Sequence, residues 1–316
     1  FDDSKTSFMA ERQELKELLT VDEYKAARHS VLDSYYTSPE IIEAIYDKLS
    51  DMGLSSGRML EPSCGVGNFI GMKPESMDLS VTGVELDSIS GRIATKLYPN
   101  ADIKVNAFEK TNLPDNTFDV AVGNVPFGEI KPYDKQYKND NLLIHDYFFV
   151  KALDKVKSGG VVAFVTSSGT MDKVNSHARE MMTKKADFLG AVRLPNNAFK
   201  ENAGAEVTTD IIFLQKKTVP TVEYNQEFAS VGKSESGISM NEYFANHPEQ
   251  ICGHMEMVSS QFGFKSACLQ DDGVSLSDRM KEALSNIKGT INTEPDIMVE
   301  EDILLTPSFE DKDGLR

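Results

Sequence analysis

Two glycines and a neighbouring acid stand at positions where they can hold a small ligand. Residues 59–69 read MLEPSCGVGNF, in which an apolar run ends at Glu61 and leads into Gly65-x-Gly67. Glycine lets a backbone approach a ligand where any Cβ would collide, and a helix predicted behind the glycines would offer free N–H groups. The dinucleotide fingerprint needs a third glycine, but Ile70 stands in its place, and Glu61 would repel a pyrophosphate. The pattern therefore favours a ligand with a positively charged ammonium group.

A second predicted strand, residues 80–85, ends in another acid, Glu85. An acid at the tip of the second strand of such a fold accepts hydrogen bonds from ribose hydroxyls. Together with Glu61 it predicts a nucleoside with a cationic amino-acid end, which describes S-adenosylmethionine. The alternative is a glycine-rich turn with two surface acids that hold no ligand.

The third stretch, Asn124-Val125-Pro126-Phe127, follows a predicted strand at residues 118–122. The exocyclic amine of a nucleobase is a weak nucleophile because its lone pair is delocalised into the ring. A fixed amide oxygen and a backbone carbonyl, each accepting one N–H, would aim that lone pair at a methyl donor, so positioning does most of the work. An adjacent aromatic ring can stack on an extruded base, which contributes about 1–3 kcal/mol and offsets much of the extrusion cost. The alternative is a polar loop with a strand-ending Asn and a buried Phe.

These residues need a scaffold that brings strand ends together, and the pattern of the chain supplies one. Strands alternate with helices, which predicts a mainly parallel sheet covered on both faces. The final two strands have only a polar loop between them and should pair antiparallel. The predicted strands are residues 58–61, 80–85, 103–105, 118–122, 161–166, 189–194 and 207–214, and the predicted helices are residues 8–30, 88–97, 145–156, 175–185 and 276–287, with a further helix starting at Thr37-Ser38-Pro39-Glu40.

The 316 residues divide by composition into unequal parts. We expect a helical extension at residues 1–30, a catalytic domain at 31–218, a small C-terminal region at 219–290 and an acidic tail or linker at 291–316. Residues from Val219 onward carry a net charge of −11 out of the total of −17.

The composition excludes several classes of protein. No run of about 18 apolar residues is present, so we expect no membrane span. Three scattered cysteines are too few for a disulfide framework or a zinc site, so we expect no metal and a reducing cytoplasm. The acidic balance disfavours nucleic acid unless a local patch binds phosphates. The best such patch is Lys131, Lys135 and Lys138, interleaved with Tyr133 and Tyr137, which is either a loop that closes over DNA or a solvated loop.

The order and spacing of the motifs resemble those of the N6-adenine DNA methyltransferases whose cofactor motifs precede the catalytic one. Residues 36–39 resemble the motif that holds the methionine end of the cofactor, and residues 61–69 resemble the glycine motif. Glu85 stands where the family has its ribose-binding acid, and residues 124–127 resemble its Asn-Pro-Pro-Tyr/Phe motif. The resemblance implies a Rossmann-like, seven-stranded S-adenosylmethionine-dependent methyltransferase fold, mostly parallel with a terminal antiparallel hairpin.

The resemblance also assigns roles to individual residues. The implied catalytic residues are Asn124, Val125, Pro126 and Phe127. The implied cofactor-binding residues are Tyr36, Thr37, Glu61, Pro62, Ser63, Gly65, Gly67, Asn68, Glu85, Leu86 and Phe108. Val125 replaces the usual first Pro, and only its carbonyl is required. The family's acid near the third strand has no clear counterpart, and Asn106 or Glu109 is expected to take its place beside Phe108.

More narrowly, the chain is similar to the methyltransferase portion of large helicase–methyltransferase proteins of conjugative elements and phages. The phrases GVELDSISGR, GNVPFG and RLPNNAF at residues 83–92, 123–128 and 193–199 carry that similarity. The implied reaction is methyl transfer from S-adenosylmethionine to N6 of an adenine flipped out of DNA, with a helicase region of the same polypeptide as a second partner. The alternatives are another planar amine (RNA adenine, cytosine N4 or protein glutamine) or a non-catalytic cofactor-binding module.

Overall fold

The structure is a computed structural model that describes residues 6–33, 36–200, 206–260 and 263–292. Its strands are β1 (Ser56–Glu61), β2 (Asp78–Glu85), β3 (Asp102–Val105), β4 (Phe118–Asn124), β5 (Val156–Ser167), β6 (Ala186–Leu194), β7 (Thr209–Lys216), β8 (Val231–Lys233), β9 (Ser239–Asn241), β10 (His254–Ser260) and β11 (Gly263–Leu269). Its α-helices are α1 (Met9–Leu18), α2 (Val21–Asp33), α3 (Pro39–Asp51), α4 (Asn68–Gly71), α5 (Ser88–Leu97), α6 (Ile144–Lys155), α7 (Gly169–Asp172), α8 (His177–Lys185), α10 (Gln226–Ala229), α11 (Glu242–Asn246) and α12 (Leu276–Asn286).

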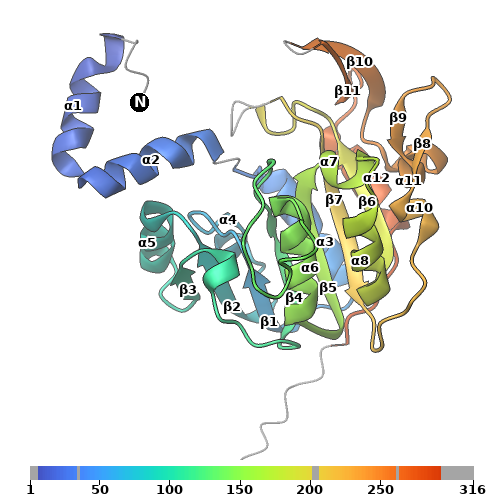
Figure 1. Ribbon diagram of the computed structural model, residues 1–316, viewed down its shortest axis with the longest axis horizontal. Helices are drawn as coiled ribbons and strands as arrows, with labels where there is room; N and C mark the ends of the chain where they lie inside the picture. The colour runs from blue at the N-terminus through green and yellow to red at the C-terminus, as the bar shows by residue number, and fades with distance from the viewer. Residues whose placement is uncertain (1–5, 34–35, 201–205, 261–262, 293–316) are drawn as a thin grey trace, which may run out of the picture.

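A seven-stranded sheet forms the centre of the molecule, in the order β3-β2-β1-β4-β5-β7-β6 (Figure 1). β3, β2, β1, β4 and β5 run parallel, whereas β7 runs antiparallel to both β5 and β6. This is the predicted α/β class with its terminal antiparallel hairpin. Because β1, β2 and β4 are parallel, their carboxyl ends meet at one edge of the sheet, and we call it the carboxyl edge.

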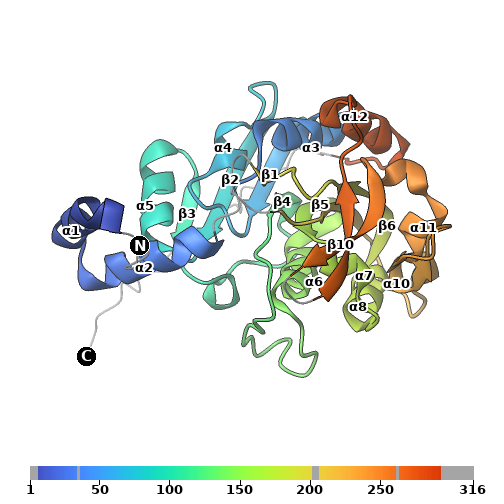
Figure 2. The same cartoon turned by 90° about the horizontal axis from the view of Figure 1, so that it is seen from above.

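Helices cover both faces of the sheet because alternate strand residues are apolar on each side. One face packs Met59, Val120 and Val161 against α3 and α12. The other face packs Leu60, Ala121 and Val162 against α6, α8 and α11. Figure 2 shows α3 and α12 on one side of the strands and α6 and α8 on the other.

Two predicted elements have different bounds in the structure. The single helix expected over residues 8–30 is broken between α1 and α2, because Thr20 and Glu23 form a capping box. The Thr20 hydroxyl accepts a hydrogen bond from the Glu23 N–H at 3.3 Å, and the Glu23 carboxylate accepts one from the Thr20 N–H at 2.9 Å. The strand expected at residues 161–166 begins earlier, at Val156 of β5, and its pairing with β4 shifts register between Phe118 and Val120.

The part of the chain after β7 adds two small hairpins and a helix. β8 pairs with β9 and β10 with β11, each antiparallel. α12 packs back onto α3, and its Met280 and Leu284 belong to the central core. The acidic tail expected at 291–316 falls almost wholly outside the described residues. Among the residues that the structure does describe, no helix has the length and hydropathy needed to cross a bilayer.

Candidate active site

The glycine turn after β1 is shaped by two backbone positions that only glycine adopts easily. Gly65 has φ +56° and Gly67 has φ +91°, both in the left-handed region. A Cβ on Gly67 would lie 2.4 Å from the ring of Tyr98, whereas a Cβ on Gly65 would meet nothing within 4 Å. The turn is therefore closed on the Tyr98 side and open at Gly65.

Glu85 is tied directly to this turn. Its carboxylate accepts a hydrogen bond from the Gly65 N–H at 2.7 Å and another from the Asp87 N–H at 2.7 Å. Burial nevertheless raises the pKa of Glu85, because it disfavours the charged form more than the backbone hydrogen bonds favour it. The predicted ribose acid thus stands beside the predicted glycine loop.

Glu61, at the end of β1, is a buried acid with one carboxyl oxygen that lacks a hydrogen-bond partner among the described residues. It is 2% exposed, and its Oε2 atom has no hydrogen-bond partner among the described residues. Burial raises its pKa well above the usual value, and the nearby charge of Glu85 raises it further. A cationic group would satisfy that oxygen and relieve the repulsion. Together with the open space at Gly65, these two acids fit the ammonium and ribose ends of S-adenosylmethionine.

Asn124 lies at the carboxyl end of β4, next to the same turn. The Ser63 hydroxyl donates a hydrogen bond to the Asn124 carbonyl at 2.8 Å. A Cβ on Gly123 would lie 3.4 Å from Cγ of Glu61, so the ends of β4 and β1 are in close contact. The predicted catalytic and cofactor motifs, with Ser63 and Asn124 61 residues apart in the sequence, are therefore neighbours at the carboxyl edge.

The remaining predicted site residues differ in how deeply they are buried. Val125 is 1% exposed, and its N–H bonds the Val165 carbonyl at 3.0 Å, which fixes the backbone after Asn124. Leu86 is 74% exposed beside Glu85. Phe108 is 2% exposed, with its ring centroid 4.9 Å from that of Phe148, so most of the ring faces the core. Pro62, Gly67 and Thr37 are buried, Ser63, Asn68, Pro126 and Phe127 are half-buried, and Tyr36 is exposed.

The helix expected behind the glycines is present as α4, which has four residues and ends shortly before Pro74, since Pro disfavours helix in the residue before it. One expectation around the site was wrong. Tyr137, expected in an exposed patch, is 7% exposed, and its hydroxyl donates a hydrogen bond to Asp154 at 2.5 Å. It therefore belongs to the core side of its loop.

Sequence reasoning missed a buried polar group next to the site. Asp134 accepts hydrogen bonds from the Tyr147 hydroxyl at 2.7 Å and from the Lys151 ammonium at 3.0 Å. Lys151 also donates to the Phe108 carbonyl at 2.8 Å. The signal in the sequence that could have predicted this group is Lys151, which stands in the apolar run of α6. A buried charge there needs a partner. This group joins the segment after Asn124 to the segment after β3.

His145 is a buried histidine near the start of α6. It is 4% exposed, and neither ring nitrogen has a hydrogen-bond partner among the described residues. Burial, with a smaller effect of Lys173, lowers its pKa to about 4. At neutral pH it is an uncharged residue near the start of α6.

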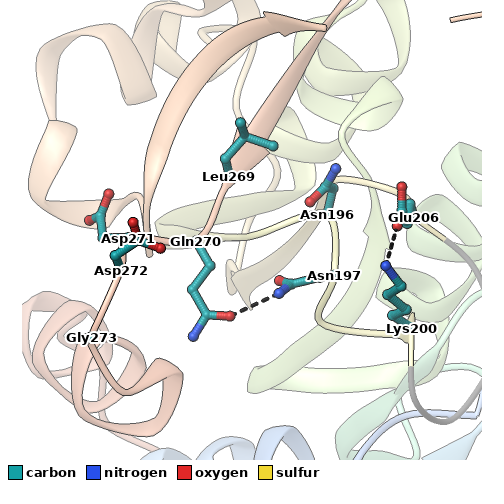
Figure 3. A pocket seen from close by; sticks show the side chains of 9 residues that line it. All are labelled: Asn196, Asn197, Lys200, Glu206, Leu269, Gln270, Asp271, Asp272 and Gly273. Atoms are coloured by element: carbon teal, nitrogen blue, oxygen red, sulfur yellow. Dashed lines mark hydrogen bonds and ion pairs between the residues drawn. The ribbon is translucent and has the colours of Figure 1, made fainter. Parts of the chain in front are cut away.

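A separate polar cavity of about 530 Å³ lies between the segment after β6 and the end of β11 (Figure 3). Asn197 donates a hydrogen bond to Gln270 at 2.9 Å, and Lys200 pairs with Glu206 at 2.7 Å. None of the site residues predicted from the sequence lines this cavity.

Comparison with known families assigns the middle of the chain. Residues 76–199 match the family model described as the Eco57I restriction-modification methylase. The chain is similar to this family over that segment. The matched segment includes β2 to β6 and the Asn124 motif, whereas the glycine turn precedes it.

Solved structures are similar to this chain at the level of the fold. A structure assigned to the class I S-adenosylmethionine-dependent methyltransferases, from Listeria monocytogenes, superimposes with a TM-score of 0.51 at 18% identity, over 68% of this chain and 71% of the other. A modification subunit of a type I restriction enzyme from Vibrio vulnificus YJ016 gives 0.50 at 13% identity, over 83% and 62%. The fold is that of the S-adenosylmethionine-dependent methyltransferases.

Three curated proteins from different sources are similar to this chain. The "Defense against restriction protein B" of Escherichia phage P1 is 33% identical over 198 residues, which is 61% of this chain and 9% of the phage protein. The "rRNA N(6)-adenosine-methyltransferase metl-5" of Caenorhabditis elegans is 24% identical over 58% of this chain and 88% of that protein. The "Modification methylase CviBIII" of Paramecium bursaria Chlorella virus NC1A is 32% identical over 35% and 30%. The chain thus spans less than a tenth of the phage protein that it matches.

Proposed function

We propose that this chain transfers a methyl group from S-adenosylmethionine to N6 of an adenine flipped out of DNA. The observation that carries the proposal is the contact between the two motifs: Ser63 of the glycine turn bonds the carbonyl of Asn124, while Gly65 of the same turn bonds Glu85. An amide and a glycine turn at one sheet edge place an acceptor amine opposite a cofactor. The similarity to restriction-modification methylases supports DNA as the acceptor.

When bound, S-adenosylmethionine would supply a methyl group on a positively charged sulfur: N6 gains the methyl group as the S–CH3 bond breaks, the neutral thioether leaves, and N6 loses one proton to solvent. The protein supplies position. The Asn124 amide oxygen and the Val125 carbonyl each accept one N–H of the adenine amine, which turns its lone pair out of the ring plane. Phe127 stacks on the extruded base. Glu61 holds the ammonium group and Glu85 the ribose hydroxyls.

Replacing Asn124 with Ala tests the proposal. We expect methylation to fall at least about 100-fold, since a misplaced acceptor loses the positioning contribution, while cofactor binding stays within a few-fold of wild type. Methylated nucleosides are measured by mass spectrometry after digestion, and cofactor binding by calorimetry. Asn100→Ala, at an exposed turn, is the matched control. Normal methylation by Asn124→Ala would contradict the mechanism.

A second candidate acceptor is adenine in RNA, which the similarity to the rRNA adenosine methyltransferase favours. Parallel incubations with DNA and with RNA separate the two, because the products are N6-methyldeoxyadenosine and N6-methyladenosine. N4-methylcytosine or methylated protein glutamine would instead identify another planar amine. Cofactor binding without any product would favour a binding module.

We further propose that the chain is the methyltransferase portion of a longer protein that includes a helicase region. The phage P1 relative supports this arrangement only through its length, since the match covers 9% of it. Methylation by the isolated chain, compared with the full polypeptide on duplex DNA with and without ATP, tests whether a helicase region contributes.

A further inference from the structure

The loop of residues 128–141, which directly follows the Asn124 motif, is fixed on its inner side. Asp134 binds Tyr147 and Lys151 of α6, and Tyr137 binds Asp154 of the same helix. The rings of Tyr137 and Tyr147 meet edge to face at 5.6 Å. Side chains of the loop thus hold it against one helix.

Backbone contacts fix the two ends of the loop as well. The Ile144 N–H donates a hydrogen bond to the Ile130 carbonyl at 2.8 Å, which closes the loop at its base. Within the loop, the Tyr137 N–H donates to the Asp134 carbonyl and the Asp140 N–H donates to the Tyr137 carbonyl. Figure 2 shows this green loop reaching outward from the sheet between β4 and α6. Side-chain and backbone contacts therefore hold the segment at several points along its length.

The outer side of the loop carries a different chemistry. Tyr133 is 78% exposed and Ile130 is 66% exposed. Lys131, Lys135 and Lys138 are exposed, and none of them forms an ion pair with the described residues. An exposed aromatic ring between lysines is suited to a stacked base beside phosphates.

Charge distinguishes this side of the loop from the rest of the molecule. The whole chain carries a net charge of −17. Within the loop the acids are Glu129, Asp134 and Asp140; Asp134 is paired with Lys151, and Asp140 lies 3.7 Å from His177. Three lysines therefore face solvent beside Glu129 and Asp140, on a loop that follows the Asn124 motif along the chain and packs against α6. An acidic protein that binds a polyanion needs such a local cationic surface.

We propose that loop 128–141 is a preformed contact surface for the nucleic-acid strand that carries the target base. The lysines contact phosphates, and Tyr133 stacks on a base next to the extruded one. This inference rests on the proposed function and adds the surface by which the substrate strand is held.

The test is binding of fluorescently labelled DNA, single- and double-stranded, measured by anisotropy over a series of salt concentrations. We expect the triple variant Lys131→Gln, Lys135→Gln, Lys138→Gln to bind at least tenfold more weakly. The slope of log affinity against log salt on duplex should fall by up to about 2.7, or about 0.9 for each lost phosphate contact. The matched control changes Lys96, Lys233 and Lys281 to Gln, at exposed positions on α5, β8 and α12.

A second pair of variants tests the aromatic contact. Tyr133→Ala should weaken single-strand binding by about 5- to 150-fold, the usual range for loss of one stacked base. Tyr133→Phe keeps the ring and should bind like wild type. Because the replaced side chains face solvent, we expect the unfolding temperature of each variant to match that of the wild type. This measurement shows whether each variant is folded.

The outcomes separate this inference from the proposed function. Unchanged affinity and salt slope in the triple variant and in Tyr133→Ala would overturn the loop surface, even if the wild type methylates DNA. Loss of binding in these variants, combined with methylation of RNA but not DNA by the wild type, would overturn the proposed substrate and keep the surface.

Discussion

The most unusual residue of the site is Glu61, a carboxyl group buried beside another carboxyl group. Burial of two like charges close together is unfavourable unless a proton or a cation neutralises one of them. The pKa of Glu61 is raised by burial and then by Glu85. Without a cation nearby, a proton on Glu61 neutralises one of the two carboxyl groups. A bound ammonium group would take the place of that proton.

Cofactor binding should therefore release a proton. In the folded protein the carboxyl of Glu61 stays protonated above the ordinary range of a glutamate, and a bound ammonium group lowers its pKa again. We expect proton release at pH values between about 4.5 and the raised pKa, measured by calorimetry of S-adenosylmethionine binding in two buffers of different ionisation enthalpy. Glu61→Gln should abolish the release and weaken binding by about 10- to 100-fold, the usual size of a charged hydrogen bond. Glu75→Gln, at an exposed position, is the control, and buffer-independent heats in the wild type would refute the assignment.

At the scale of elements, α6 fixes the segment that comes after β4. Lys151 on this helix reaches both Asp134 in loop 128–141 and the carbonyl of Phe108 after β3. Burial alone would raise the pKa of Asp134, but the hydrogen bonds from Tyr147, Gln136 and Lys151 outweigh it, so the pKa is lowered. Helix α6 thereby links loop 128–141, on the substrate side of the proposed site, to the segment after β3, on the side proposed for the cofactor's adenine.

Replacing Asp134 with Asn should loosen the loop without unfolding the domain. We expect faster amide hydrogen exchange over residues 128–141 and a loss of about 1.5–3 kcal/mol of stability at pH 7, since hydrogen bonds to a charged group are lost. A carboxylate with a lowered pKa stabilises the folded state above its ordinary pKa, and this contribution disappears as the pH falls through the folded-state pKa. The stability gap between variant and wild type should therefore narrow below about pH 4. The control is Asp140→Asn, whose partner His177 is exposed; equal exchange in both variants would contradict the anchoring role.

At the scale of the whole molecule, one buried arginine joins the sheet to the small C-terminal region. Arg193 of β6 is fully buried and bonds Asp210 of β7 at 2.8 and 2.9 Å and Asp172 of α7 at 2.9 Å. Asp172 also accepts the N–H of Asn241 at 2.8 Å, and the ring centroid of Phe244 lies 4.3 Å from the guanidinium. Residues after 219 thus share a charged network with the carboxyl edge, so they fold as part of the same body.

Arg193→Met should destabilise the whole chain because it leaves two carboxylates without their counter-charge. We expect a loss of about 3–5 kcal/mol in the free energy of unfolding, measured by denaturant titration. The double variant Arg193→Met, Asp210→Leu should lose less than the sum of the single changes. Lys104→Met removes an exposed pair with Asp102 and should cost less than about 1 kcal/mol. A loss that small for Arg193→Met would show that the network does not hold the two parts together.

The local pattern of the sequence was sufficient to predict the order of the elements. It also predicted the glycine turn with Glu85 and the Asn124 motif as the two parts of the site. Helix α5 has the predicted bounds, with Asp87 capping it through the Ser90 N–H at 2.7 Å. Capping, apolar periodicity and glycine turns depend on residues a few positions apart, so a sequence records them directly. The same reasoning failed at Thr20, where a capping box interrupts an otherwise continuous helical pattern.

By itself, the sequence determined the α/β class, the antiparallel final pair of strands and the stretches that contain Glu61, Glu85 and Asn124. Only the tertiary structure decided that Tyr137 faces the core, that Lys151 joins Asp134 to Phe108, and that Arg193 holds the C-terminal region. The physical reason is that the burial of a polar side chain depends on partners far along the chain. The cost of desolvating a side chain depends on all the groups that surround it in space. The sequence shows only which residues are neighbours along the chain.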